Sequence, residues 1–385
     1  MNSACLFDLP LSVQRIGHSC TIVGDIIVII GGLRGRVRYY FSLDILPSAA
    51  HEPVKYLSNG SSLVYCDKRF IACGGLGNEY MNISTLGPDK YSGWLEIQPK
   101  YNRKPIERNK HSAWLFKNKF YVWGCFGKRL DSRNSLYCDS NVSSNVSYKD
   151  NRELVCFEDQ VLAFNFENKI WEKVNTYGNI PCPRAGQAAV LVKNDLFMFG
   201  GRSKQRRMND MHKLNMLTMR WSVLFNDSEK KSKPTGRSFH TLSYFQKSNF
   251  LFLYGGLSFE GIPLADEWIL KLDSLDWFCI SKNACRPRLW HVTLPTLDSM
   301  AITIGGVSNN AQNIGLSDYP YPIKEHRFGP SSLYRICFKI VYKGKSQWNL
   351  LPQSIKQELH NWFIFDQMSE LRIIHGNENL QQIFK

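Results

Sequence analysis

Residues 187–201 read QAAVLVKNDLFMFGG, and this arrangement is repeated along the chain. A polar residue, Gln187, is followed by an apolar run, a turn of Lys, Asn and Asp, a second apolar run and a pair of glycines. Two apolar runs joined by a turn of this composition predict an antiparallel β-hairpin. The stretch is therefore expected to be one copy of a repeated hairpin that organises the whole fold.

Pairs of glycines end an apolar run at intervals of about fifty residues. The copies are Gly31–Gly32, Gly74–Gly75, Gly200–Gly201, Gly255–Gly256 and Gly305–Gly306, with an imperfect copy at Gly124–Cys125. A polar residue stands 13 to 15 positions before each pair: His18, Ser61, His111, Gln187, His240 and His291. A tryptophan ends the later part of four copies: Trp94, Trp171, Trp221 and Trp277. Because the histidines share one place in a repeat, we expect them to support loops, not to bind a metal or act in catalysis.

A period near fifty residues with a glycine pair and a late tryptophan resembles the kelch repeat, whose fold is a β-propeller. A four-stranded sheet cannot bury both of its faces alone, but it does so between two neighbours, and glycines let the backbones approach closely. We therefore predict an all-β chain with a six-bladed kelch β-propeller over residues 14–330. Either residues 9–14 or a strand near residues 323–328 would complete the last blade. The Ser/Asn-rich residues 138–151 are expected to form a long surface loop.

The composition indicates a globular chain with a basic surface. The 385 residues carry a formal charge of +15, which favours a polyanionic or carboxylate-bearing partner, although a basic surface that only serves solubility explains it equally well. The sequence shows no nucleic-acid-binding motif and no apolar run of about eighteen residues, so we expect neither nucleic acid nor a membrane as a partner. The N-terminus has no basic signal region, and the 11 cysteines form no CxxC pair. These features predict reduced thiols, no metal or other cofactor, and a location in the nucleus and cytoplasm.

Two segments after the last repeat differ from the rest of the chain. In residues 332–341, SLYRICFKIV, a helix would place Leu333, Cys337 and Val341 on one face. In residues 351–359, LPQSIKQEL, Pro352 is suited to start a helix, which would place Ile355 and Leu359 on one face. Two amphipathic helices that pack back on the propeller would explain both patterns.

The order and spacing of the two segments resemble a pair of known binding motifs. Residues 332–341 resemble the BC-box that binds Elongin, and residues 351–359 resemble a cullin-2 box, with every defined position met in both. The resemblance implies a helical C-terminal segment over residues 331–385 that joins Elongin B/C, cullin-2 and its RING subunit. It also implies that Leu333, Cys337 and Val341 contact Elongin C, while Leu351, Pro352 and Ile355 contact cullin-2.

The residues that follow Gly200–Gly201 distinguish this copy of the repeat from the others. Arg202 and Arg207 lie in the loop after the glycines, and Ser238 lies at the start of the next copy. The planar guanidinium group matches a carboxylate, with two parallel charge-assisted hydrogen bonds. Without further information, a solvated basic loop is the alternative for these arginines, and Arg206 beside them fits that description.

Three segments resemble the family of kelch domain-containing protein 2: Gly200–Arg202 with Arg207–Asp210, Thr235–His240 and Pro287–His291. The resemblance implies a non-catalytic receptor that captures the free C-terminus of a substrate ending in glycine. Its carboxylate would be bound by Arg202, Arg207 and Ser238. The pocket wall would be formed by Lys110, Phe126, Phe157 and Phe239, and the three phenylalanines stand where the family has Tyr or Trp. The loop with Ala311–Gln312 also departs from the family pattern.

The function that follows is a substrate-recognition subunit of a cullin-2–RING E3 ubiquitin ligase. It would bind C-terminal glycine degrons of the diglycine type and direct its targets to ubiquitination and proteasomal degradation. A kelch scaffold that binds proteins without degrading them is the alternative. An enzyme of the kind formed by metal-dependent kelch oxidases would need converging His, Tyr and Cys ligands, and the repeat-like histidines do not predict them.

Overall fold

The computed structural model describes most of the repeated region and little of the chain beyond it. The described residues are 16–23, 26–34, 37–38, 60–66, 69–75, 80–86, 95–100, 104–106, 108–128, 146–149, 153–204, 206–227, 232–282, 287–296, 300–309, 323–328, 351–353 and 356. None of the helical residues among them belongs to a helix long and apolar enough to cross a membrane.

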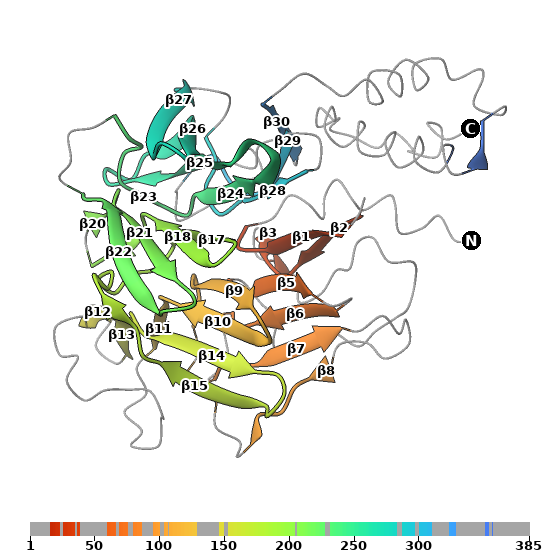
Figure 1. Cartoon of the computed structure of the whole chain (residues 1–385), viewed down its shortest axis with the longest axis vertical. Coiled ribbons are helices and arrows are strands. Elements are labelled where there is room, and N and C mark those ends of the chain that lie inside the picture. Colours follow the sequence, from red (N-terminus) through yellow and green to blue (C-terminus); the bar gives the residue numbers. More distant parts are fainter. Residues whose placement is uncertain are drawn as a thin grey trace.

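The predicted hairpins form radially arranged antiparallel sheets, each numbered here after its copy of the repeat (Figure 1). The innermost strands are β1 (Ser19–Val23), β5 (Ser62–Cys66), β9 (Ser112–Phe116), β17 (Ala188–Val192), β24 (Thr241–Phe245) and β28 (Val292–Pro295). The second strands are β2 (Ile26–Ile30), β6 (Arg69–Cys73), β10 (Lys119–Trp123), β18 (Asp195–Phe199), β25 (Phe250–Ser258) and β29 (Met300–Ile304). The third strands are β7 (Ile83–Leu86), β14 (Val161–Asn165), β21 (Met211–Asn215), β26 (Pro263–Lys271) and β30 (Ile323–Arg327). The fourth strands are β8 (Leu95–Glu96), β15 (Ile170–Val174), β22 (Arg220–Phe225) and β27 (Asp276–Ser281).

The innermost strands contact one another in ring order, from β1 through β5, β9, β17, β24 and β28 back to β1. Five of these positions carry a sheet of three or more of the strands named above, and the first carries only the β1–β2 hairpin among the described residues. The structure thus shows five blades, and the prediction of six is corrected to this number. The reason is local: residues 39–59, which follow the first hairpin, lie outside the described part of the chain.

The last sheet is completed by a strand from the far end of the repeated region. β30 pairs antiparallel with β29, with Ile323 opposite Ile304. Of the two segments that the sequence left open for completing the last blade, the strand near residues 323–328 is therefore observed in this sheet. The other, residues 9–14, lies outside the described residues.

Shorter elements decorate the sheets. Strands β11 (Phe126–Lys128), β12 (Val146–Lys149) and β13 (Glu153–Phe157) form a separate small sheet. The surface loop predicted over residues 138–151 is therefore in part a strand, since β12 pairs with β13. The remaining elements are β3 (Leu33–Arg34), β4 (Val37–Arg38), β16 (Tyr177–Gly178), β19 (Arg202–Ser203), β20 (Arg206–Arg207), β23 (Arg237–Ser238) and the 3-10 helix η4 (Gln246–Ser248).

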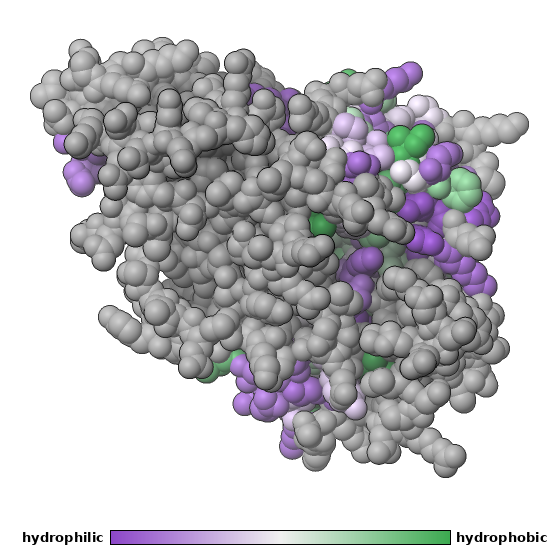
Figure 2. Space-filling model, turned by 180° about the vertical axis from the view of Figure 1, so that it is seen from behind, coloured by the Kyte–Doolittle hydropathy of each residue, from purple (hydrophilic) through white to green (hydrophobic). Residues whose placement is uncertain are grey.

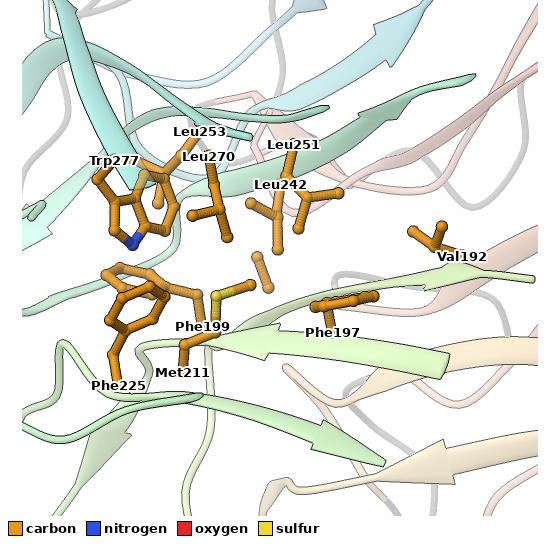
Figure 3. Packing of buried hydrophobic residues seen from close by; sticks show 11 residues of the cluster. Val192, Phe197, Phe199, Met211, Phe225, Leu242, Leu251, Leu253, Leu270 and Trp277 are labelled. Atoms are coloured by element: carbon orange, nitrogen blue, oxygen red, sulfur yellow. The ribbon is translucent and has the colours of Figure 1, made fainter. Parts of the chain in front are cut away.

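The hydrophobic core lies between neighbouring sheets. In Figure 3, Phe199, Met211 and Phe225 of sheet 4 face Leu253, Leu270 and Trp277 of sheet 5. The repeated tryptophan serves this packing: the ring centroid of Trp277 lies 5.4 Å from that of Phe199 in the preceding sheet. Each buried aromatic side chain of this kind removes about 150–250 Å² from water. On the face opposite to that of Figure 1, hydrophobic residues of the described surface are visible only as small spots among hydrophilic ones (Figure 2).

The glycine pairs hold neighbouring sheets together. Gly200 has a φ of +67°, and a Cβ atom there would lie 2.7 Å from the carbonyl oxygen of Arg237 in sheet 5. The N–H of Gly201 donates to the same carbonyl at 2.8 Å. The same bond recurs between other neighbours, from Gly75 to Arg108, from Cys125 to Arg184 and from Gly256 to Arg288. The first glycine thus makes room for a carbonyl of the next sheet, and the following residue binds it.

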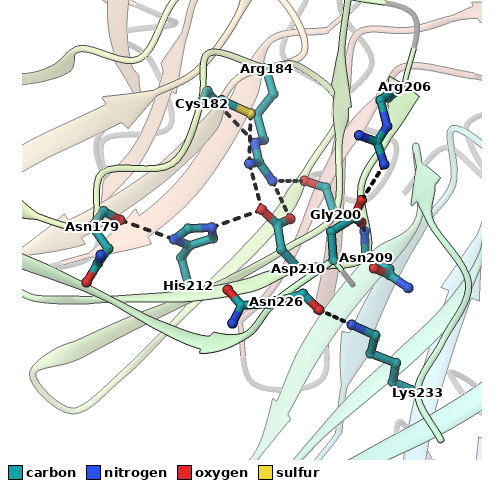
Figure 4. Close-up of polar contacts among 11 residues, drawn as sticks. Asn179, Cys182, Arg184, Gly200, Arg206, Asn209, Asp210, His212, Asn226 and Lys233 are labelled. Carbon is teal, nitrogen blue, oxygen red and sulfur yellow. Dashed lines mark hydrogen bonds and ion pairs between the residues drawn. The ribbon is translucent and has the colours of Figure 1, made fainter. Parts of the chain in front are cut away.

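Arg184, at the start of sheet 4, binds the first glycine of the pair in its own sheet through its side chain (Figure 4). Its guanidinium group is 1% exposed and makes a bidentate pair with Asp210, with Nη1–Oδ1 at 2.6 Å and Nη2–Oδ2 at 2.8 Å. Nη1 also donates to the carbonyl of Gly200 at 3.0 Å. Burial would raise the pKa of Asp210, but hydrogen bonds from His212 and Arg184 hold the pKa well below its usual value. The buried charge is therefore fully paired, as burial requires.

Arg237 repeats this arrangement in sheet 5, with a bidentate pair to Asp266 and a bond to the carbonyl of Gly255. The sequence contains a signal for these arginines that our prediction did not use. An arginine stands three residues before the polar residue in five of the six copies: Arg15, Arg108, Arg184, Arg237 and Arg288.

The repeated polar residues pack against the glycines, and this explains their place in the repeat. The Cε1 atom of His240 would lie 3.0 Å from a Cβ atom at Gly200, and Gln187 Nε2 would lie 2.6 Å from one at Gly124. Burial lowers the pKa of His111 to about 4 and that of His240 to about 3. Among the described residues, no three His, Cys, Asp or Glu side chains come together as a metal site.

Little of the predicted C-terminal segment, residues 331–385, belongs to the described chain. Gln353 and Lys356 are α-helical, and the N–H of Lys356 donates to the carbonyl of Pro352 at 3.0 Å, which fits a helix that begins at Pro352. Leu351 is half-buried and Pro352 is exposed. The BC-box, residues 332–341, and Ile355 lie outside the described residues.

The buried histidines predict a loss of stability in weak acid. A histidine in the unfolded chain has a pKa of about 6.5. Between about pH 6.5 and 4 the unfolded state therefore binds more protons, and each buried histidine lowers the free energy of unfolding by about 1.4 kcal/mol per unit of falling pH. We expect His240→Gln to reduce the pH dependence of urea unfolding by that amount, because Gln187 occupies the same place in sheet 4. Gln187→His is the reverse control and should steepen the dependence. An unchanged slope in both variants would contradict a neutral buried imidazole.

The contact between Gly200 and Arg237 predicts a second effect. We expect Gly200→Ala to lower the free energy of unfolding by about 2–5 kcal/mol, because a side chain there is strained and meets a backbone oxygen. Gly261→Ala is the matched control: Gly261 has a φ of +79°, but a Cβ atom there would meet nothing within 4 Å. It should cost only about 1–2 kcal/mol, the cost of the left-handed backbone. Equal losses in urea unfolding would show that the close approach does not matter.

Candidate functional site

The residue before each polar residue of the repeat lies close to the propeller axis. Five backbone hydrogen bonds connect these positions in succession: Gly60 to Gly17, Gly17 to Trp290, Trp290 to Phe239, Phe239 to Gly186 and Gly186 to Lys110. All six residues have a positive φ, between 57° and 82°. We call these six residues the axial ring.

Three members of the axial ring are not glycine, although the left-handed backbone favours glycine. Lys110, Phe239 and Trp290 have φ values of 57°, 61° and 58°. Phe239 and Trp290 are in contact, with ring centroids 5.4 Å apart, and Lys110 Nζ lies 5.1 Å from the centroid of Phe239. Gly186 leaves space for this group, since a Cβ atom there would lie 2.8 Å from the Phe239 ring. Strained side chains gathered at one point are typical of a binding site.

Arg202 and Arg207 lie next to the axial ring. They are opposite each other on the two-stranded ladder of β19 and β20, so their side chains project from the same face. The backbone of Arg202 also exchanges two hydrogen bonds with Ala185, the neighbour of Gly186. The loop after the glycine pair is thus folded back over the start of its own sheet.

Arg207 reaches across to sheet 5. Its Nε donates to Ser238 Oγ at 2.9 Å, and Ser238, fully buried, directly precedes Phe239. Gly236 permits this approach, because a Cβ atom there would lie 2.2 Å from the carbonyl oxygen of Arg207. The bond to Ser238 fixes the plane of the guanidinium group and leaves its outer nitrogens for another acceptor, apart from a long contact of 3.4 Å from Nη1 to the carbonyl of Phe259.

The two arginines have no acidic partner within ion-pair distance among the described residues. Burial lowers the pKa of Arg207, and the positive charge of Arg202 lowers it further, while Glu260 opposes the effect. Two like charges opposite each other on a ladder are unfavourable. A bound anion would remove this repulsion, and a carboxylate matches the donors of the guanidinium groups in number and geometry.

The structure brings together five of the seven residues predicted for the site: Lys110, Arg202, Arg207, Ser238 and Phe239. For the other two, Phe126 and Phe157, it describes the backbone alone. They are directly opposite each other in the ladder of β11 and β13. Arg206, which the sequence did not include in the site, is 72% exposed and pairs with Asp227 at 2.8 Å.

Trp290 is a site residue that the sequence analysis missed. It lies in the segment Pro287–His291 that carried the family resemblance, one residue before His291. In two other copies of the repeat, the residue at this same position had been predicted as a wall residue: Lys110 and Phe239. The same position in the sixth copy would have identified Trp290 if the copies had been compared at this place.

Comparisons with known proteins agree with this fold. Residues 147–319 match the model of the KLHDC2/KLHL20/DRC7 Kelch-repeats domain. The chain is 28% identical to kelch domain-containing protein 2 of Bos taurus over 319 residues, which cover 79% of this chain and 76% of that protein. It is 28% identical to kelch domain-containing protein 1 of Mus musculus over 291 residues, which cover 74% and 70%. The solved structure of YjhT is similar in fold, with a TM-score of 0.56 at 16% identity over 77% of this chain and 92% of that one.

The similarities and the repeated hairpins confirm the resemblance that the sequence segments indicated. The similarity to kelch domain-containing protein 2 extends over 79% of the chain, and the match to the kelch-repeat model spans the arginine loop. The chain is an all-β kelch propeller similar to kelch domain-containing proteins 2 and 1, and its residues 147–319 match the KLHDC2/KLHL20/DRC7 kelch-repeat model.

Proposed function

We propose that this chain is a non-catalytic substrate receptor that binds the free C-terminus of proteins ending in glycine. The observation that carries the proposal is the pair Arg202 and Arg207, which are opposite each other beside the axial ring without an acidic partner among the described residues. The site offers donors for a terminal carboxylate from Arg202 and Arg207, with Ser238 orienting the second of these. Similarity to kelch domain-containing protein 2 supports a protein-interaction role for the propeller.

A terminal glycine suits this arrangement for a steric reason. The arginines lie next to the group of Lys110, Phe239 and Trp290, in which the Phe239 ring centroid is 5.4 Å from that of Trp290 and 5.1 Å from Lys110 Nζ. A glycine brings its carboxylate to such a place without a side chain that would have to be accommodated there. An amidated or extended peptide would leave the arginines without an anion, and the loss of a charge-assisted bond costs about 1.5–3 kcal/mol.

The proposed role in the cell depends on the C-terminal segment. Residues 332–341 and 351–359 would join Elongin B/C, cullin-2 and its RING subunit, and so make the chain the recognition subunit of an E3 ubiquitin ligase that acts in nucleus and cytoplasm. Leu333, Cys337 and Val341 would contact Elongin C. Leu351, Pro352 and Ile355 would contact cullin-2, and the exposure of Pro352 is compatible with such a contact.

The carboxylate site is tested with labelled peptides that end in two glycines, as free acid and as amide. Measured by fluorescence polarisation, the free acid should bind the full chain at least about tenfold more tightly than the amide, because only the acid supplies the anion. Arg207→Ala should lose most of this binding. Arg206→Ala is the matched control, since Arg206 is the exposed neighbour that pairs with Asp227, and it should change the affinity by less than about twofold. Equal affinity for acid and amide would refute the site.

The ligase role is tested by co-purification. The double variant Leu333→Ala with Cys337→Ala should lose Elongin B/C, since it removes the side chains that would fill the pocket on Elongin C. It should keep its affinity for the free-acid peptide, because the propeller is unchanged. If Elongin B/C remains bound to the double variant, the BC-box interpretation is wrong. A chain that binds the peptide but never Elongin would instead be a kelch scaffold that does not degrade its partners.

A further inference from the structure

A pocket of about 350 Å³ opens beside Arg207, and no residue of the axial ring lines it. Arg207 and Asp227 line it from sheet 4. The turn between β25 and β26 of sheet 5 lines it with Phe259, Glu260 and Ile262. We call this cavity the side pocket. The side pocket and the proposed carboxylate site thus share Arg207.

The turn of sheet 5 holds two large apolar side chains in the solvent. Phe259 is 56% exposed and Ile262 is 58% exposed. The turn itself is well fixed: the N–H of Ser258 donates to the carbonyl of Ile262 at 2.9 Å, and the N–H of Ile262 donates to Ser258 Oγ at 3.2 Å. A rigid turn that keeps apolar side chains exposed at the rim of a pocket provides a wall for the aliphatic part of a ligand.

The same rim carries an acidic group. Hydrogen bonds from Ser258 and from its own backbone lower the pKa of Glu260, and the charge of Arg207 lowers it further, so it is ionised at neutral pH. No cationic side chain of the described residues forms an ion pair with it. The other acid of the pocket, Asp227, already accepts bonds from Arg206 and from the N–H of Asn209. Glu260 is therefore the carboxylate that a cation on a ligand would meet.

We propose that the side pocket receives a lysine or arginine side chain from the same peptide, a few residues before its terminal glycine. The inference rests on the proposed carboxylate site. The long apolar stem of such a side chain would pack against Phe259 and Ile262, while its charged end would approach Glu260. An arginine would in addition stack on the Phe259 ring. An extended peptide advances about 3.3–3.6 Å per residue, so residues close to the carboxylate on Arg207 are within reach.

The net charge of the whole chain predicts the opposite preference, for acidic over basic peptides. With a formal charge of +15, non-specific attraction favours peptides with acidic residues. A preference for a basic residue must therefore come from a local group. The bound carboxylate also helps, because it neutralises the charge of Arg207 that would otherwise repel the incoming cation.

The experiment compares free-acid peptides that end in two glycines and differ only in the three positions before them, which hold Lys, Gln or Glu in turn. Fluorescence polarisation with the full chain should show, at one of these positions, about tenfold tighter binding for Lys than for Glu, with Gln between them. Glu260→Lys should reverse the order, because the rim then repels a cation. Asp276→Asn is the matched control, since Asp276 is an exposed acid on the outer strand of the same sheet, and it should leave the order unchanged.

The outcomes separate this inference from the function on which it rests. If the free acid and the amide bind equally, the carboxylate site itself is wrong. If binding needs the free carboxylate but Lys and Glu peptides bind alike, or acidic peptides bind more tightly, only the side-pocket proposal is overturned. The same holds if Glu260→Lys keeps the preference for lysine. Reversal by Glu260→Lys together with an unaffected Asp276→Asn would support it.

Discussion

The fold depends on one close approach between backbones, the contact of a glycine pair with a carbonyl of the next sheet. At Gly200 the space of the missing side chain is taken by the carbonyl oxygen of Arg237, which the N–H of Gly201 then binds. The contact needs a left-handed backbone and no Cβ atom, and only glycine meets both conditions without strain. It recurs between further sheets and sets the distance at which the hydrophobic side chains of neighbouring sheets meet, as in Figure 3.

The candidate site is a direct consequence of this contact. Sheet 4 binds the carbonyl of Arg237 through the N–H of Gly201. This bond fixes the positions of the next two residues, Ser238 and Phe239, near the propeller axis. The loop with Arg202 and Arg207 begins directly after Gly201 and folds back over this contact. Arg207 and Ser238 can therefore form a hydrogen bond at 2.9 Å although they belong to different sheets. The scaffold and the site share one junction, that between sheets 4 and 5.

Several features of this junction are unfavourable for the free chain. Two arginines are opposite each other, and Phe239 and Trp290 adopt a backbone that glycine would adopt more easily. The buried pairs Arg184–Asp210 and Arg237–Asp266 and the packed core below stabilise the surroundings in which these features persist. The strand before the C-terminal segment is tied to the same sheet, because Glu267 accepts bonds from Lys324 and His326 of β30 at 2.7 and 2.6 Å. Sheet 5 thus contacts both Arg207, through Ser238, and strand β30, through Glu267.

The repeats in the sequence were sufficient to predict the type of fold. Hairpins with Gly-Gly, a polar residue and a late tryptophan recur with a constant order, and a repeat of this kind can bury its faces only by packing against copies of itself. It also singled out Arg202, Arg207 and Ser238, because an arginine stands directly after a glycine pair only at Arg202 and a family resemblance connected this loop with the next copy. The arginine three residues before the polar residue in five of the six copies was also visible in the sequence, but our prediction did not use it.

The way in which these parts meet depends on the packing between sheets. The spacing of residues along the chain does not show that Arg207 bonds to Ser238 or that Trp290 contacts Phe239 in the axial ring. Nor does it show that Glu260 and Phe259 line a pocket together with Arg207. These are contacts between different sheets, and they depend on the angle and distance at which the sheets pack. The described residues also form five blades where the sequence predicted six, since residues 39–59 after the first hairpin lie outside the described part of the chain. The repeats along the chain therefore predicted the propeller scaffold, and the packing between neighbouring sheets determined how the residues of the candidate site meet.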